Sequence, residues 1–195
     1  MVTVVGEEKA SRRVVTHDQV VQAGVEQFLR RSTIDMEDLA AGMAISRATL
    51  YRVAGSRDAL LDDVLRALTE VMFAESRAAR TAAGFDGVVE VSRHFGEQLR
   101  SPVLETFLRQ EPEAASRVLF TPAGGVNESA VANQLAVFRE TGLVDELPPG
   151  ADVPHLAFLY VRMVGAFLYA EFFTGKKADF DELVPALRSL LTPAN

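Results

Sequence analysis

The 195-residue sequence is 48% hydrophobic and 24% charged, which is typical of a soluble globular protein and excludes collagen-like, low-complexity and disordered chains. It has no cysteine, which excludes disulfides, iron–sulfur clusters, thiolate zinc sites and cysteine nucleophiles. The net charge of −7 is uneven, because residues 1–60 hold eight basic and eight acidic side chains and the remainder carries the whole excess. A neutral N-terminal third can still bind phosphates if its arginines share one face.

The first four predicted helices follow from apolar residues that recur at the helical period of 3.6, while no alternating segment of useful length predicts a strand. Thr16 begins a capping box ahead of the first helix, and Asp35 and Ser46 can cap two short helices that follow it. Ser56 can cap a longer helix that continues to about residue 80. These signals predict three short helices followed by a long one.

Five further helices are expected after residue 84, over about 88–99, 102–111, 127–142, 153–174 and from 179 onward. The dipeptide Glu111-Pro112 ends or kinks its helix, because proline lacks the N–H that a helix interior requires. The whole chain therefore reads as all-α, with about nine helices and no internal repeat. We divide it into an N-terminal arm (1–15), an N-terminal domain (16–60) and a C-terminal domain (61–195).

The chain carries no readable targeting or membrane segment. Its first 30 residues lack the apolar stretch of a signal peptide. The most apolar segment, His155 to Thr174, contains Arg162 and Glu171, which a bilayer-spanning helix would rarely place so deep. We expect a cytoplasmic protein with no membrane partner.

The turn Met43–Ser46 joins the second and third helices, which is the geometry of a helix-turn-helix whose third helix enters a major groove. Arg47 and Ala48 are the first exposed side chains of that helix. Arginine can bind guanine O6 and N7, and alanine can pack against a thymine methyl group. Further DNA contacts are expected from side chains suited to phosphate, which are Thr33, Ser46, Thr49, Arg52 and, in the arm, Arg12 and Arg13.

The segment from Ile34 to Arg52 resembles the DNA-binding domain of TetR-family transcriptional regulators. The shared elements, in register over about residues 16–65, are Asp38-Leu39-Ala40, Ile45-Ser46, Thr49-Leu50-Tyr51 and Ser56-Arg57-Asp58-x-Leu60-Leu61. The resemblance implies that Tyr51 hydrogen-bonds a phosphate. Two departures stand out, because Ala44 replaces the family's common turn glycine and Val53-Ala54 replaces its aromatic pair.

The stretches 50–57 and 107–113 carry a weaker resemblance to regulators of quorum-sensing signal degradation. That resemblance implies a pocket for an acyl lactone or a similar amphiphile. The residues expected to line it are Phe95, Leu104, Phe107, Leu108, Phe120, Leu135, Phe138, Phe158 and Met163, with His94, His155 and Arg162 as polar anchors. Each of these side chains can equally fill a core or lie on the surface.

The apolar helix over 153–174 has more apolar faces than one core can use, and the last helix adds another. We expect two such helices from each subunit to form a four-helix dimer interface, as in the resembled family. The residues expected there are Leu159, Ala166, Phe167, Ala170, Phe173, Leu183, Leu187 and Leu190.

The leading functional hypothesis is therefore a homodimeric repressor that binds a palindromic operator in double-stranded DNA and is released by a small hydrophobic or amphiphilic effector. We expect no cofactor, metal or catalytic residue, because the three histidines lack metal-ligand spacing and no nucleophile motif or phosphate loop is present. The alternatives are a helical lipid or ligand carrier with a vestigial helix-turn-helix and, as a third class, an all-α enzyme.

Overall fold

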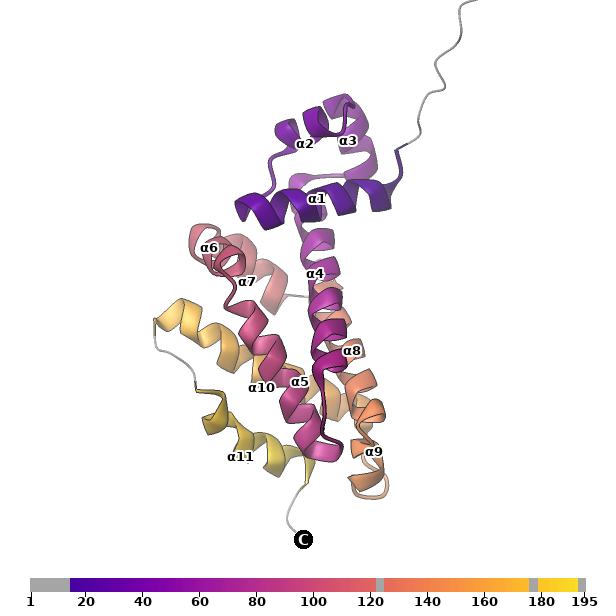
Figure 1. Cartoon of the computed structure of the whole chain (residues 1–195), viewed down its shortest axis with the longest axis vertical. Coiled ribbons are helices and arrows are strands. Elements are labelled where there is room, and N and C mark those ends of the chain that lie inside the picture. Colours follow the sequence, from indigo (N-terminus) through magenta and orange to yellow (C-terminus); the bar gives the residue numbers. More distant parts are fainter. Residues whose placement is uncertain (1–14, 122–124, 176–178, 193–195) are drawn as a thin grey trace, which may run out of the picture.

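The computed structural model describes residues 15–121, 125–175 and 179–192, and within them it contains eleven helices and no strand (Figure 1). The all-α prediction is confirmed. The expected number of helices is too low by two, because α7 (Pro112–Phe120) and α9 (Leu143–Glu146) were not foreseen. Pro112 occupies the first position of α7, where a missing N–H costs nothing, so the proline starts a helix as well as ending one.

Helices α1 (His17–Arg31), α2 (Met36–Gly42) and α3 (Arg47–Ala54) form the head at the top of Figure 1. Each begins at an expected cap. Thr16 and Gln19 form the capping box of α1, and the side chains of Asp35 and Ser46 accept backbone N–H groups of α2 and α3. Local sequence therefore determines where these helices start.

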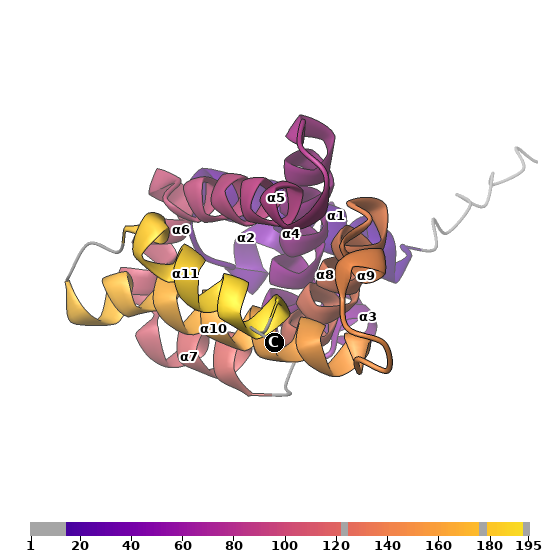
Figure 2. The ribbon, with the colours of Figure 1, turned by 90° about the horizontal axis from the view of Figure 1, so that it is seen from below.

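The long helix α4 (Arg57–Ala79) leaves the head and enters the C-terminal bundle (Figure 1). The bundle contains α5 (Gly84–Leu99), α6 (Pro102–Gln110), α7, α8 (Val126–Glu140), α9, α10 (Val153–Thr174) and α11 (Phe180–Leu191). Seen from below in Figure 2, α11 lies between α5 and α10 and contacts both. Helix α8 packs against α4 on one side and α10 on the other.

The head shares its apolar core with α6 and α7. Phe107 and Leu108 of α6 belong to the same buried cluster as Phe28 of α1 and Leu61 of α4. The rings of Phe28 and Phe107 meet edge to face with centroids 5.3 Å apart. The first turns of α4 and the α6–α7 pair therefore hold the head against the bundle.

Helix α10 is long and apolar enough to cross a membrane by length and composition, with a mean hydropathy of 1.4 over Val153–Ala170. Core helices of soluble proteins pass the same criterion, and α10 packs against α6, α8 and α11. Only 22% of that window is buried inside the protomer, so much of its apolar surface has no cover within the described chain.

Candidate DNA-reading head and ligand cavity

The first turn of α3 faces solvent while the opposite side of the helix is anchored in the head. Leu50 is fully buried and Ala54 is 4% exposed, whereas Arg47 and Ala48 are exposed. The Arg47 guanidinium lies 3.8 Å from the Glu37 carboxylate, and both side chains are largely exposed. An ion pair this open contributes little to stability, so Arg47 is free to exchange Glu37 for a base edge.

The hydroxyl groups at the start of α3 cap the helix. The Thr49 N–H donates to Ser46 Oγ at 3.1 Å, and the two hydroxyl oxygens lie 2.9 Å apart. Each hydroxyl oxygen has two lone pairs and one rotatable proton, so the pair can also meet a phosphate oxygen. Tyr51 is 41% exposed and Arg52 is exposed, and both lie further along α3. Arg12 and Arg13 lie outside the described residues.

The turn between α2 and α3 places Ala44 in the left-handed region, with φ at 55°. The N–H groups of Ala44 and Ile45 donate to the carbonyl oxygens of Ala41 and Ala40, which closes the turn. An L-residue with a Cβ pays about 1–2 kcal/mol for this conformation. The turn therefore keeps the geometry that glycine would give it, at a cost in stability.

Thr33, expected to contact phosphate, lies in a network that ties the head to the start of α7. Its hydroxyl donates to Glu111 Oε1 at 2.6 Å, and Arg57 Nη2 donates to both carboxylate oxygens of Glu111 at 2.6 and 2.8 Å. Arg57 Nε also donates to the carbonyl oxygen of Ile34 at 2.9 Å. Burial raises the pKa of Glu111, but the hydrogen bonds from Arg57 and Thr33 and the Arg57 charge outweigh it and lower that pKa overall. Thr33 thus has partners within the subunit, and its contact with a DNA phosphate stays a prediction.

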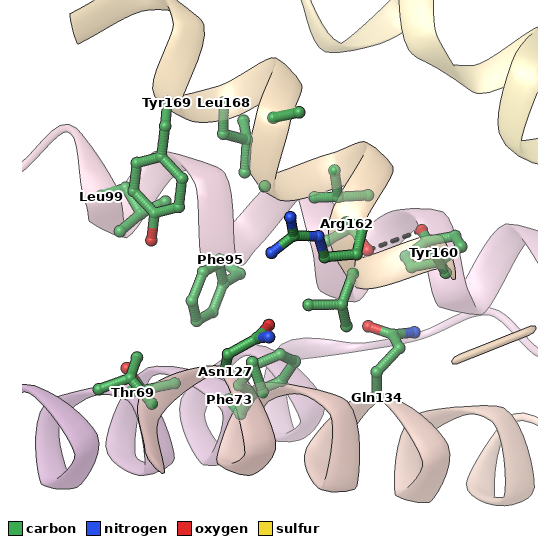
Figure 3. A pocket seen from close by; sticks show the side chains of 17 residues that line it. Thr69, Phe73, Phe95, Leu99, Asn127, Gln134, Tyr160, Arg162, Leu168 and Tyr169 are labelled. Carbon is green, nitrogen blue, oxygen red and sulfur yellow. Dashed lines mark hydrogen bonds between the residues drawn. The ribbon is translucent and has the colours of Figure 1, made fainter. Parts of the chain in front are cut away.

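A cavity of about 150 Å³ lies in the bundle between α4, α5, α8 and α10 (Figure 3). Its walls are mostly apolar, with Phe73 from α4, Phe95 and Leu99 from α5, and Leu168 from α10. The Ser92 hydroxyl is 2.8 Å from the Tyr160 hydroxyl at one side of it. Burial raises the pKa of Tyr160, so this phenol stays neutral and serves only as a hydrogen-bonding group.

Three nitrogen-bearing side chains add to the polar groups that line the cavity. Asn127 and Gln134 rise from α8, and Arg162 reaches toward them from α10 (Figure 3). Gln134 is 2% exposed, and its Nε2 has no hydrogen-bond partner in the described part of the chain. An unsatisfied buried donor costs about 1–3 kcal/mol, so this side chain is placed for something other than stability.

A second cavity of about 30 Å³ adjoins the first and shares Thr69, Leu99, Val126 and Tyr169 with it. Its other walls include Leu104, Phe107 and Leu108 of α6. Because Phe107 lines the smaller cavity and also packs against Phe28 of the head, α6 contacts both this cavity and α1. A ligand that displaces α6 would therefore act directly on the head.

A family model described as the tetracyclin repressor-like C-terminal domain matches residues 83–192, which is more than half of the chain. The chain belongs to the TetR family. No protein with a curated description matches the sequence. TetR-family regulators bind DNA and small-molecule effectors and are typically dimers. They are regulators and not enzymes, which confirms the expectation that this chain is not an enzyme.

Solved structures of TetR-family proteins share the fold over nearly their full lengths. The transcriptional repressor QsdR from R. erythropolis gives a TM-score of 0.81 at 21% identity, covering 92% of this chain and 95% of QsdR. The repressor AlkX from Dietzia sp. strain DQ12-45-1b, implicated in n-alkane biodegradation, gives 0.63 at 18% identity, covering 93% and 100%. A TetR-family protein from Mesorhizobium loti MAFF303099 gives 0.55 at 15% identity, covering 93% and 96%.

The ligand residues expected from sequence fall into three groups in this TetR-family fold. Phe95 and Arg162 line the larger cavity, and Leu104, Phe107 and Leu108 line the smaller one. Neither cavity is lined by His94, Leu135, Phe138, His155, Phe158 or Met163, within the residues the structure describes. Phe138 instead packs edge to face on Tyr160, and Phe158 is 41% exposed. The side chain of Phe120 lies outside the described set.

The sequence reasoning missed the α8 side of the cavity. Asn127, Ala130 and Gln134 share one face of α8, because residues three, four and seven apart lie on the same side of a helix. Two amides on an inward-facing stripe are a readable signal for a polar site. The pattern of aromatic residues, from which the cavity lining was predicted, does not include them.

The expected interface residues of α11 are corrected by the structure. Leu183 and Leu187 lie in the core of the bundle, at 9% and 0% exposure, because α11 turns its leucines toward α5 and α10. Leu190 is half-buried. On α10, Ala166 and Ala170 are exposed, Leu159 and Phe167 are half-buried, and the side chain of Phe173 lies outside the described set. Among the described residues, no group of three acidic or histidine side chains could hold a metal ion.

Proposed function

We propose that the chain is a homodimeric repressor whose α3 helices read a palindromic operator and whose bundle cavity takes a small amphiphilic effector that releases the DNA. The observation that supports it most is the unpaired Gln134 Nε2 in the larger cavity, which adjoins the smaller cavity whose α6 wall also packs against the head. A core built only for stability gains nothing from such a group, whereas an effector site does.

The DNA contacts follow from the exposed side of α3. Arg47 and Ala48 are assigned to base edges, and Ser46, Thr49, Tyr51 and Arg52 to phosphates. Arg12 and Arg13 of the N-terminal arm are assigned to the DNA backbone as well. In a dimer, two such helices spaced about 34–36 Å apart would enter successive major grooves on one face of the duplex.

Helix α4 and the α6–α7 pair would transmit effector binding to the head and so cause release of the DNA. Helix α4 lines the cavity with Thr69 and Phe73 and reaches the head at Arg57. There Arg57 is bound to Glu111 at the start of α7. An effector that favours a wider spacing of the two reading helices would lower DNA affinity by shifting the population of states.

The proposed effector is a small hydrophobic or amphiphilic molecule, such as an acyl lactone. The apolar walls and the few polar groups of the cavity suit a molecule of this kind. The likeness to QsdR at 21% identity supports the proposed QsdR-like subgroup.

The proposed dimer interface is the outward face of α10 around Ala166, Phe167 and Ala170, which begins one helical turn beyond the exposed Arg162 at the edge of the cavity. Its small residues allow close helix approach. Ala170→Glu is expected to yield monomers in analytical ultracentrifugation. Ala186→Glu, on the exposed polar side of α11, is the matched control and should leave the dimer intact. A dimeric Ala170→Glu protein would place the interface elsewhere.

We also propose a cytoplasmic location, which fits a soluble DNA-binding regulator of this family. The proposed division of the chain is an N-terminal arm (1–15), a DNA-binding domain (16–60) and a ligand-binding and dimerisation domain (61–195). The alternative, a ligand carrier with a vestigial helix-turn-helix, draws on the same cavity. It differs in predicting no selective binding to duplex DNA.

The deciding experiment is selection of the purified protein on random duplex DNA, followed by affinity measurements at two salt concentrations. Enrichment of an inverted repeat, with affinity that falls steeply as salt rises, is expected of an operator-binding dimer. A blank result with both the purified and the delipidated protein would overturn the repressor and favour the carrier.

A further inference from the structure

We propose that the cavity recognises the carboxylate of a medium-chain acid, so that within the proposed class of amphiphilic effectors the free acid binds more tightly than the closed lactone. This inference deepens the proposed function and rests on it, since it names the chemistry of the molecule that occupies the effector cavity. It is carried by the hydrogen-bonding character and the charge of the polar side chains around the cavity, and by the volume of its apolar part.

The polar part of the cavity includes one buried donor that lacks an acceptor. Gln134 Nε2 is buried and unpaired among the described residues. The Asn127 amide lies on the same side of α8, about two helical turns from Gln134 (Figure 3). A ligand group that accepts several hydrogen bonds, as a carboxylate does with its two oxygens, would satisfy these donors. An alcohol or an amine would bring fewer acceptor sites to the same place.

Arg162 supplies a positive charge at the solvent-exposed edge of the cavity, because this residue lines the cavity and is itself exposed. It is the one charged side chain among the described residues that line the cavity, and no carboxylate lines it. Within the described chain Arg162 also has no hydrogen bond or ion pair, although acidic residues outnumber basic ones by 27 to 20 in the whole sequence. Arginine binds a carboxylate through two parallel N–H donors, and such charged pairs are roughly twice as strong as neutral ones. The arrangement therefore favours an anion over a neutral ester.

The apolar part sets the length of the tail. The cavity measures about 150 Å³, and an apolar cavity of that volume accommodates benzene, so roughly six tail carbons fit. The smaller cavity beside Tyr169 adds about 30 Å³ in the direction of α6, which is room for about one more methylene group. A tail of six or seven carbons would fill the larger cavity and press on the α6 wall that contacts the head.

The test compares ligands of equal carbon number by isothermal titration calorimetry on the full chain. Heptanoate is compared with 1-heptanol, and 4-hydroxyheptanoate with its closed form, γ-heptalactone. We expect each acid to bind at least about 10-fold more tightly than its neutral partner, because a hydrogen bond to a charged group is involved. Equal affinity within either pair would overturn the proposal. In a series from butanoate to dodecanoate, affinity should peak near seven or eight carbons, and a continuous rise to dodecanoate would refute the assigned tail site.

Two variants and a matched control locate the carboxylate. Arg162→Gln should weaken heptanoate about 10- to 100-fold and leave 1-heptanol within a factor of three, whereas Arg139→Gln, on the exposed end of α8, should change neither. Gln134→Leu should also weaken heptanoate selectively. Unchanged heptanoate affinity in both cavity variants would overturn the assignment, and circular dichroism would verify that all three variants fold.

DNA binding separates this inference from the function on which it rests. Wild-type protein that selects an inverted repeat but shows no preference for acids retains the proposed function and loses the inference. Acid-selective binding that depends on Arg162, in a protein with no DNA selectivity, retains the carboxylate site and overturns the repressor. Release of the selected DNA by heptanoate, and not by 1-heptanol at the same concentration, is the result that supports both.

Discussion

Glu111→Ala is expected to loosen the head from the rest of the subunit. The carboxylate accepts hydrogen bonds from Arg57 at 2.6 and 2.8 Å and from Thr33 at 2.6 Å, and its side chain is 21% exposed. Hydrogen bonds to charged groups contribute about 1.5–3 kcal/mol, while fully exposed ion pairs contribute about 0–1 kcal/mol. Arg57 is 33% exposed, so water compensates for part of the loss. The free energy of unfolding should therefore fall by about 2–3 kcal/mol.

The assay is urea unfolding at a fixed protein concentration, with Glu113→Ala as the matched control. Glu113 is exposed in the first turn of the same helix, and its loss should cost less than about 1 kcal/mol. A double-mutant cycle of Glu111→Ala with Arg57→Met should give a coupling energy of at least about 1 kcal/mol, as expected for residues in one network. If Glu111→Ala and Glu113→Ala destabilise equally, the network does not hold the head and the reasoning fails.

Three further predictions concern the head. Arg47→Ala should cost about 1–3 kcal/mol at the selected operator and relax base choice at one position, measured by repeating the selection; a uniform loss across sequences would make Arg47 a phosphate contact. Ala44→Gly should raise the free energy of unfolding by about 0.5–1 kcal/mol, because relief of the left-handed Cβ outweighs the entropy of glycine, while Ala41→Gly inside α2 should lower it. Finally, Glu111 has a folded-state pKa below its ordinary value of 4.5, so its stabilisation is present at neutral pH and is lost as the pH falls below 4.5 through the lower folded-state pKa. Urea midpoints of wild type and Glu111→Gln should therefore differ at pH 7 and converge as the pH falls below 4.5, and a constant difference would contradict the pKa shift.

The sequence alone determined the helix-turn-helix, because its signals are local. A cap such as Ser46 acts on an N–H three residues away, and a face such as Met36, Leu39 and Ala40 repeats within two turns. The order of α1 to α4 could be read for this reason. The left-handed turn at Ala44 could be inferred from the family's glycine at that position. The local signals did not predict that α7 begins at Pro112, because proline can end one helix and also favours the first position of the next.

Tertiary structure alone decided which partner each of these residues meets. Periodicity shows that Leu183 and Leu187 share an apolar face, but it does not show that α5 and α10 cover that face inside the same subunit. The sequence around Thr33 does not indicate that Glu111, 78 residues away, accepts a hydrogen bond from its hydroxyl group. Gln134 became a site residue only when four helices enclosed its amide, because burial without a partner is a property of the assembled bundle and not of any segment.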